Sequence, residues 1–186
     1  TRIRYEAGNA KQATMTLRLS NRGKAMRPVS MQRLWGGGRF NENYNTDREP
    51  IDFEIPDNAA KVEIATHITG HGWGVEIENC AEFCNHTHHF VVNDTDEYVK
   101  RHPMADNPLG CIEQIPDGVV PNQYGSWPFG RAGWCPGLDV KPWVADITSS
   151  IQPGTNSMTY RGLFQGGNYV PQANPNPPGG FGANIT

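Results

Sequence analysis

The segment Lys61-Val-Glu-Ile-Ala-Thr-His-Ile68 shows the residue pattern that decides the fold class. Polar and apolar residues alternate along it, which places the valine and the two isoleucines on one face of an extended strand and His67 on the other. Ile51–Ile55 alternates in the same way and stops at a proline, a residue that ends strands. Both segments therefore predict strands that are buried on one face.

Similar short segments recur with turn residues between them, at Thr14–Leu19, His88–Val92, Trp143–Ile147 and Ser157–Tyr160. No segment has the periodicity of a long amphipathic helix, while 21 glycines and 15 prolines favour turns and loops. This combination predicts an all-β fold, an antiparallel β-sandwich of the jelly-roll type. The 186 residues are enough for one such domain with a buried core.

Two long stretches interrupt the strand pattern. Residues 103–143 contain few strand signals but several prolines and three tryptophans, and a loop of that length is usually functional or held by a cross-link. Residues 171–182 are rich in Pro, Asn and Gly and are expected to form a flexible surface loop. The last residues look like the beginning of another strand, so one interpretation is that the segment stops short of the last strand of its domain.

Charge and cysteine content limit the possible partners and location. The net charge of −3 lacks the basic character of a nucleic-acid-binding domain, and no apolar run is long enough to cross a membrane. Four cysteines allow three pairings; proximity favours Cys80–Cys84 and Cys111–Cys135, with a cysteine-rich zinc site as the alternative. Disulfides would indicate an oxidising compartment, and we expect a secreted or periplasmic protein.

The stretch from Cys80 to His89 contains two cysteines, one glutamate and three histidines, which are candidate catalytic or metal-binding residues. It reads Cys-Ala-Glu-Phe-Cys followed by Asn-His-Thr-His-His. In an extended strand, His86 and His88 lie on one face and His89 on the other. Two imidazoles on one face of a strand are a good start for a metal site. In the alternative interpretation, the histidines are hydrogen-bonded and bind no metal.

Three motifs carry a family resemblance: Ile68-Thr-Gly-His-Gly-Trp-Gly74, Cys80-Ala-Glu-Phe-Cys84 and Arg131-Ala-Gly-Trp-Cys-Pro-Gly137. Together they resemble the second domain of the peptide-N-glycosidase F family, over about residues 1 to 165. The resemblance implies two jelly-roll domains in the whole protein, of which this chain supplies the second. It also supports the disulfide pairing. The implied activity is hydrolysis of the amide bond between an asparagine side chain and the first sugar of an N-glycan.

The resemblance also implies roles for individual residues. Glu82 matches the functional glutamate between the paired cysteines, and Arg131 matches an arginine that contacts the substrate. Trp73, Phe83 and Trp134 are candidate stacking platforms for sugar rings. In the alternative interpretation, Glu82 is a solvated loop carboxylate and Trp134 belongs to the core.

The chain differs from the family pattern at two positions, and it corresponds to only one of the two domains of the family. His71 stands where the pattern has a tryptophan, and is still a candidate for contact with substrate, and His86 stands where it has an arginine. The essential aspartate of the family belongs to the first domain. We therefore expect this domain to need a preceding jelly-roll domain and an N-glycoprotein or glycopeptide substrate, and to be inactive alone. This reaction requires no cofactor.

A second resemblance, to copper-dependent peptidylglycine monooxygenases, rests on His86-Thr-His-His89 and on Met158, 72 positions after His86. It implies a copper ion held by His86, His88 and Met158, with His71 as a possible substitute ligand. Imidazole and thioether are ligands that suit copper. If the methionine is instead a core residue, the copper interpretation loses its third ligand. A third possibility is a non-catalytic glycan-binding module.

Overall fold

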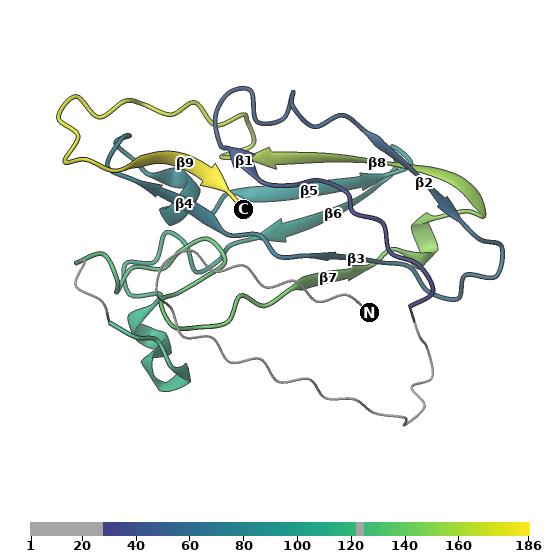
Figure 1. Cartoon of the computed structure of the whole chain (residues 1–186), viewed down its shortest axis with the longest axis horizontal. Coiled ribbons are helices and arrows are strands. Elements are labelled where there is room, and N and C mark those ends of the chain that lie inside the picture. The colour runs from purple at the N-terminus through teal and green to yellow at the C-terminus, as the bar shows by residue number, and fades with distance from the viewer. Residues whose placement is uncertain (1–27, 122–124) are drawn as a thin grey trace, which may run out of the picture. The chain divides into compact units, whose positions relative to one another are not determined.

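The computed structural model describes residues 28–121 and 125–186. The chain divides into two compact units, Thr1–Gln32 and Arg33–Thr186, and every helix and strand described below lies in the second (Figure 1). The strand expected at Thr14–Leu19 lies outside the described residues. Within those residues no helix is long and apolar enough to cross a membrane.

The described elements are mostly short strands, as the sequence predicted. In chain order they are β1 (Gly38–Arg39), β2 (Ile51–Ile55), β3 (Glu63–Thr66), β4 (Gly70–Trp73), α1 (Cys80–Phe83), β5 (Thr87–Val92), β6 (Asp96–Arg101), the 3-10 helix η1 (Ile112–Asp117), β7 (Trp143–Asp146), the 3-10 helix η2 (Thr148–Ser150), β8 (Gly154–Leu163) and β9 (Phe181–Ile185). The strands expected around residues 51, 64, 90, 145 and 158 are confirmed. Sequence reasoning missed the single-turn helix α1.

Within residues 28–121 and 125–186, the paired strands are all antiparallel and form three sheets. One has the order β2-β8-β5-β6, a second β1-β9-β4, and β3 pairs with β7. β8 lies between β2 and β5, which come before it in the chain (Figure 1). Such an order needs long connections between sheets, as in Greek-key and jelly-roll folds.

A single main core joins the sheets. Alternate residues of β5 and β8 point into it, among them Phe90, Val92, Met158 and Tyr160, and Ala183 and Ile185 enter it from β9. Because side chains of a strand alternate between its two faces, this packing follows directly from the polar–apolar pattern. The all-β antiparallel sandwich is confirmed.

Both predicted disulfides are present. Cys80–Cys84 flanks α1, and Cys111–Cys135 closes a 24-residue separation within the long loop. Around the second bridge, Cys111, Cys135 and Val119 form a small separate core with Met104, Trp127 and Leu138 packed against it. No cysteine is free among the described residues, so the cysteine-rich zinc alternative is wrong.

The Pro/Asn/Gly-rich stretch is hydrogen-bonded to the segment that follows β4 and is shorter than expected. Ile77 N–H donates to Gln172 O, and Asn174 N–H donates to Val75 O. Phe181 and Gly182, which we had included in the loop, begin β9. β9 is the middle strand of its sheet. That the segment stops short of the last strand of its domain stays a prediction. Flexibility of the loop stays a prediction.

Candidate functional site

Glu82 is held in a short, disulfide-closed helical turn. Asn79, in the left-handed backbone region (φ 51°), begins the turn, and its carbonyl accepts the backbone N–H groups of Glu82 and Phe83, each at 3.0 Å. Only 6% of Glu82 is exposed. The alternative that made Glu82 a solvated loop carboxylate is therefore wrong.

The Glu82 carboxylate accepts two hydrogen bonds that fix its orientation. Arg131 Nε donates to Oε1 at 2.8 Å, and the backbone N–H of Gly72 donates to Oε2 at 3.0 Å. The Glu82 carbonyl also accepts the backbone N–H of Ala132 at 2.8 Å. A buried carboxylate is tolerated only when it is paired and hydrogen-bonded, and here two segments of the chain, one with Gly72 and one with Arg131, supply the partners.

The remaining donors of Arg131 bind the loop that precedes it. Its guanidinium donates to the carbonyl oxygens of Ser126 at 2.9 Å, Phe129 at 3.1 Å and Trp127 at 3.3 Å. The side chain is 3% exposed. In this lobe, Arg131 therefore orders the 126–129 loop and pairs with Glu82.

Three of the four proposed substrate-contacting rings surround this ion pair. The Arg131 guanidinium lies over the rings of Trp134, 4.8 Å from its centroid, and Phe83, at 5.3 Å. Trp134 also donates its indole N–H to Gly70 O at 2.9 Å and lies against the ring of His71. His71 is hydrogen-bonded to Thr69 Oγ1, and burial lowers its pKa, an effect that Glu82 opposes.

The fourth ring, Trp73, is the most exposed of the set. It lies at the end of β4, pairs in register with Phe181 and is 47% exposed. Trp134 is half-buried, with its indole nitrogen bound to the backbone. Trp73 is thus the ring with the most surface available for contact with a bound sugar, while Trp134 is fixed in orientation.

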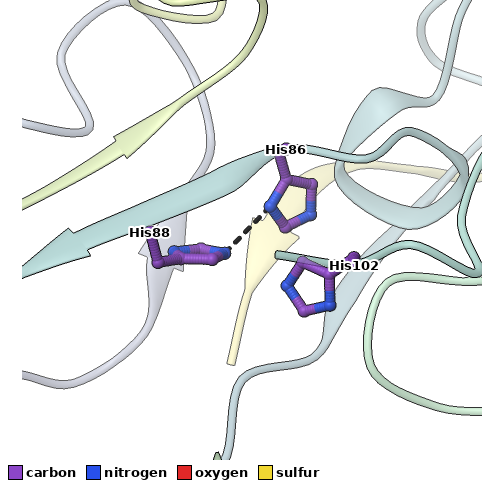
Figure 2. A group of neighbouring side chains, drawn as sticks. All are labelled: His86, His88 and His102. Carbon is purple, nitrogen blue, oxygen red and sulfur yellow. Dashed lines mark hydrogen bonds between the residues drawn. The ribbon is translucent and has the colours of Figure 1, made fainter. Parts of the chain in front are cut away.

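A second cluster consists of three histidines, His86, His88 and His102 (Figure 2). It lies next to α1, since His86 Nε2 contacts Ala81 O. All three are almost completely buried. One ligating nitrogen of each lies within 4.8 Å of the others. His86 and His88 share one face at the start of β5, as alternation predicted, and His102 follows β6 directly.

The partners of His86 and His88 determine their tautomers. His86 Nε2 is 2.9 Å from Ala81 O; a carbonyl can only accept, so Nε2 carries the proton and Nδ1 is an acceptor. His88 Nε2 must then donate to His86 Nδ1, 2.9 Å away. It follows that His88 Nδ1 accepts from Tyr160 Oη at 2.6 Å, and Tyr160 accepts from Tyr44 at 2.9 Å. The result is a buried chain of hydrogen bonds with a single direction.

His102 completes the cluster but not the chain. Lys100 Nζ lies 3.3 Å from His102 Nδ1, while Nε2 is buried without a hydrogen-bond partner. Burial lowers the pKa of His86 to about 4 and that of His102 to about 2, and holds the pKa of His88 well below its usual value. The three imidazoles are therefore neutral near pH 7, the form that binds metals.

Met158 does not join these histidines. In the β5–β8 register His88 pairs with Gly162, whereas Met158 pairs with Val92, four residues further along. At about 3.4 Å per residue, the two positions are separated by roughly 13 Å along the sheet. Met158 is a buried core residue, so its placement as third ligand is wrong, and His71 is occupied elsewhere.

Sequence reasoning missed His102, although a signal was present. β5 and β6 form a hairpin in which Thr87 pairs with Arg101. Continuing that register by one residue places His102 opposite His86. The turn residues Asn93 and Asp94, both with positive φ, could have predicted this pairing.

A shallow groove of about 580 Å³ lies on the other side of β5. It is lined by Asn85, Thr87, His89, Arg101, Asp106, Leu163, Phe164, Gln165 and Gly166. The groove contains neither Glu82 nor Arg131, so the predicted catalytic residues lie outside it.

A sequence model of the family described as "Peptide-N-glycosidase F, C terminal" matches residues 39–182. The chain belongs to this family. Peptide-N(4)-(N-acetyl-β-D-glucosaminyl)asparagine amidase F from Elizabethkingia miricola is 29% identical over 114 residues, which are 59% of this chain and 30% of that protein. The resemblance inferred from the three motifs is confirmed.

Solved structures have a similar fold. A recombinant peptide:N-glycanase F (TM-score 0.50, 22% identity) matches 80% of this chain and 48% of its own. A crystal structure of peptide-N(4)-(N-acetyl-β-D-glucosaminyl)asparagine amidase (TM-score 0.50, 21% identity) matches 79% and 48%. At this identity the likeness shows the fold. The chain spans less than half the length of these peptide-N-glycosidase F relatives.

Proposed function

We propose that this domain is the second lobe of a glycan amidase that hydrolyses the bond between asparagine and the first sugar of N-glycans. Membership of the peptide-N-glycosidase F C-terminal family supports this proposal. The observation that carries it is the buried Glu82–Arg131 pair, because it places the two motif residues in direct contact.

Glu82 suits a role that requires a fixed carboxylate. Two donors hold its oxygens, and the Cys80–Cys84 bridge closes the turn that carries it. A carboxylate oriented in this way can accept a hydrogen bond from a sugar or amide group and position it for attack. Arg131 acts as a positioning residue in this proposal, because its donors are directed to Glu82 and to the 126–129 loop.

The aromatic rings supply the surface for the sugar. Trp73 presents an exposed ring at the end of β4, next to Gly72, whose N–H binds Glu82. A sugar stacked on Trp73 would thus contact the residue that follows Gly72, the donor to the Glu82 carboxylate. Phe83, Trp134 and His71 surround the ion pair and would shape the same region.

The reaction also needs a group that this lobe does not supply. We propose that a preceding jelly-roll domain contributes it, that the lobe alone is inactive, and that the substrate is an N-glycoprotein or glycopeptide. Two disulfides favour a secreted or periplasmic location. The copper monooxygenase alternative gains no support, because Met158 lies away from the histidines.

The test is release of glycan from a glycopeptide by the full-length protein, followed by mass spectrometry. We expect Glu82→Gln to lower the rate at least about 100-fold, the scale of a lost acid–base or oriented carboxylate group. Glu78→Gln, four residues earlier and exposed, is the matched control and should retain activity. Undiminished release by Glu82→Gln would overturn the assignment. Glycopeptide binding without release by the wild-type protein would instead identify a non-catalytic glycan-binding module.

A further inference from the structure

We infer that His86, His88 and His102 form a buried copper(I) site behind the turn that carries Glu82. The inference rests on the histidine cluster itself and does not depend on the proposed amidase function. Three imidazoles from two strands converge with no charged ligand among them (Figure 2). The ligating atoms are His86 Nδ1, His88 Nε2 and His102 Nε2.

The surroundings of the cluster resemble those of metal-binding histidines. Such a histidine usually donates its other ring N–H to a carbonyl, carboxylate or hydroxyl group. His86 Nε2 already donates to Ala81 O, and His88 Nδ1 lies 2.6 Å from Tyr160 Oη. His102 Nε2 has no partner although it is buried. An unpaired buried polar group destabilises the folded state, and a bound ion would remove that cost.

The spacing requires only small movements of the rings. Metal–imidazole bonds of about 2.0–2.1 Å place ligand nitrogens roughly 3.3–3.6 Å apart in tetrahedral or trigonal sites. His86 Nδ1 and His88 Nε2 are 2.9 Å apart, and one ring nitrogen of each of the three histidines lies within 4.8 Å of the others. The first pair must open slightly and His102 must approach.

Binding needs no net loss of protons. The proton on His88 Nε2 moves to Nδ1, which then donates to Tyr160, and Tyr160 donates to Tyr44; the direction of this part of the chain reverses. His102 becomes the Nδ1–H tautomer, and Lys100 keeps its hydrogen bond to Arg101 O, at 2.7 Å. All three histidines remain neutral.

Charge selects the ion. The cluster contains no carboxylate or thiolate, and Lys100 Nζ is 3.3 Å from His102. Since the cost of burying an ion rises with the square of its charge, a dication such as Zn²⁺ would carry an uncompensated charge in this site. Copper(I) carries a single charge, and imidazole suits copper. We therefore assign the site to copper(I) in preference to zinc.

The site would act on the Glu82 turn. Ala81, whose carbonyl accepts from His86, directly precedes Glu82, and the strand residue Gly70 lies against the same carbonyl. A metal ion that fixes the His86 ring would join β5, the end of β6 and α1. Its role is structural: it holds the turn in which the carboxylate is presented.

The experiment loads the chelator-treated full chain with copper(I), supplied anaerobically as its acetonitrile complex without thiol, followed by dialysis. We expect about one copper per chain, a higher melting temperature, and an X-ray absorption spectrum with nitrogen ligands at about 2.0 Å and no sulfur. His102→Asn should lose both the bound copper and the thermal shift. His67→Asn, an exposed histidine, and Met158→Leu should retain both.

Three results would overturn the site. Wild-type protein that retains no copper shows that the histidines are a metal-free hydrogen-bonded chain. Copper retention that is unchanged in His102→Asn, or lost in His67→Asn, places the ion elsewhere. Tighter retention of Zn²⁺ than of copper(I), measured by competition under the same conditions, contradicts the charge argument. Circular dichroism of each metal-free variant establishes that it is folded before loading.

Discussion

Arg131 Nε donates to Glu82 Oε1 at 2.8 Å, joining a helical turn to a loop 49 residues later in the chain. Both side chains are buried, so neither charge has water as an alternative partner. The pair lies at the centre of the predicted site, and Arg131 also orders the 126–129 loop that precedes it. Its removal should therefore affect stability as well as any activity.

Loss of one member of this pair should cost more than loss of both. Arg131→Met leaves a buried carboxylate unpaired, and we expect it to lower the free energy of unfolding by about 3–5 kcal/mol. Glu82→Gln combined with Arg131→Met should recover part of that loss. Urea unfolding of the wild-type protein and these two variants measures the difference, and equal losses in the single Arg131→Met and double variants would show that the ion pair is not the cause.

Gly70 should tolerate no side chain. A Cβ placed there would lie 1.5 Å from Ala81 O and 3.0 Å from His86 Nε2, so Gly70→Ala must displace β4 or α1. We expect a loss of at least about 1–3 kcal/mol, as for other overpacked sites. Gly182→Ala is the matched control, since a Cβ there meets nothing within 4 Å. Equal melting temperatures for the two variants would contradict the contact.

The Cys111–Cys135 bridge should contribute more to stability than the Cys80–Cys84 bridge. In the chain-entropy account, a cross-link stabilises by restricting the unfolded chain, and the effect grows with loop length. The separations are 24 and 4 residues. We expect replacement of Cys111 and Cys135 by alanine to cost about 2–4 kcal/mol. Thermal denaturation of both double variants gives the order, which the prediction requires to favour the longer loop.

The metal-free domain should lose stability as the pH falls from about 6.5 toward 4. Burial lowers the pKa of His86 to about 4 and that of His102 to about 2, whereas in the unfolded chain both titrate near 6.5. Between these values the unfolded state binds more protons, so acid favours unfolding, by up to about 1.4 kcal/mol per pH unit for each group. Urea unfolding from pH 7 to 5 in the presence of chelator measures the slope.

The variant His102→Asn provides the control for that prediction. It removes one titrating group without adding a charge, so the slope between pH 7 and 5 should become shallower. The variant His67→Asn, at an exposed position, should leave the slope unchanged. A slope that is identical in all three proteins would assign the acid sensitivity to other groups.

Much of the architecture could be predicted because it depends on local patterns. Alternation of polar and apolar residues predicted β2, β5, β7 and part of β8, and it predicted correctly that His86 and His88 share a face. Nearness in the chain favoured the two disulfides that the structure contains. The helical turn α1 was missed because four residues are too few to show helical periodicity.

Which residues make up the histidine cluster depends on the register between strands. The resemblance to copper-dependent monooxygenases suggested Met158 as a partner of the histidines, but the β5–β8 pairing places it beside Val92 and places Gly162 beside His88. His102 enters the cluster through the β5–β6 hairpin. A shift of one residue in either register would turn these side chains to the opposite face, so the third histidine follows from the hairpin register and not from nearness to His86 in the chain.

The sequence by itself determined the fold class, the family and the residue types of the candidate site, because alternation and short motifs are properties of neighbouring residues. Only the tertiary structure decided that Glu82 is buried against Arg131, that Met158 belongs to the core and that His102 joins His86 and His88. These contacts arise where segments far apart in the chain pack together. Strand register decides which side chains meet, and a buried charge requires a partner that is buried with it.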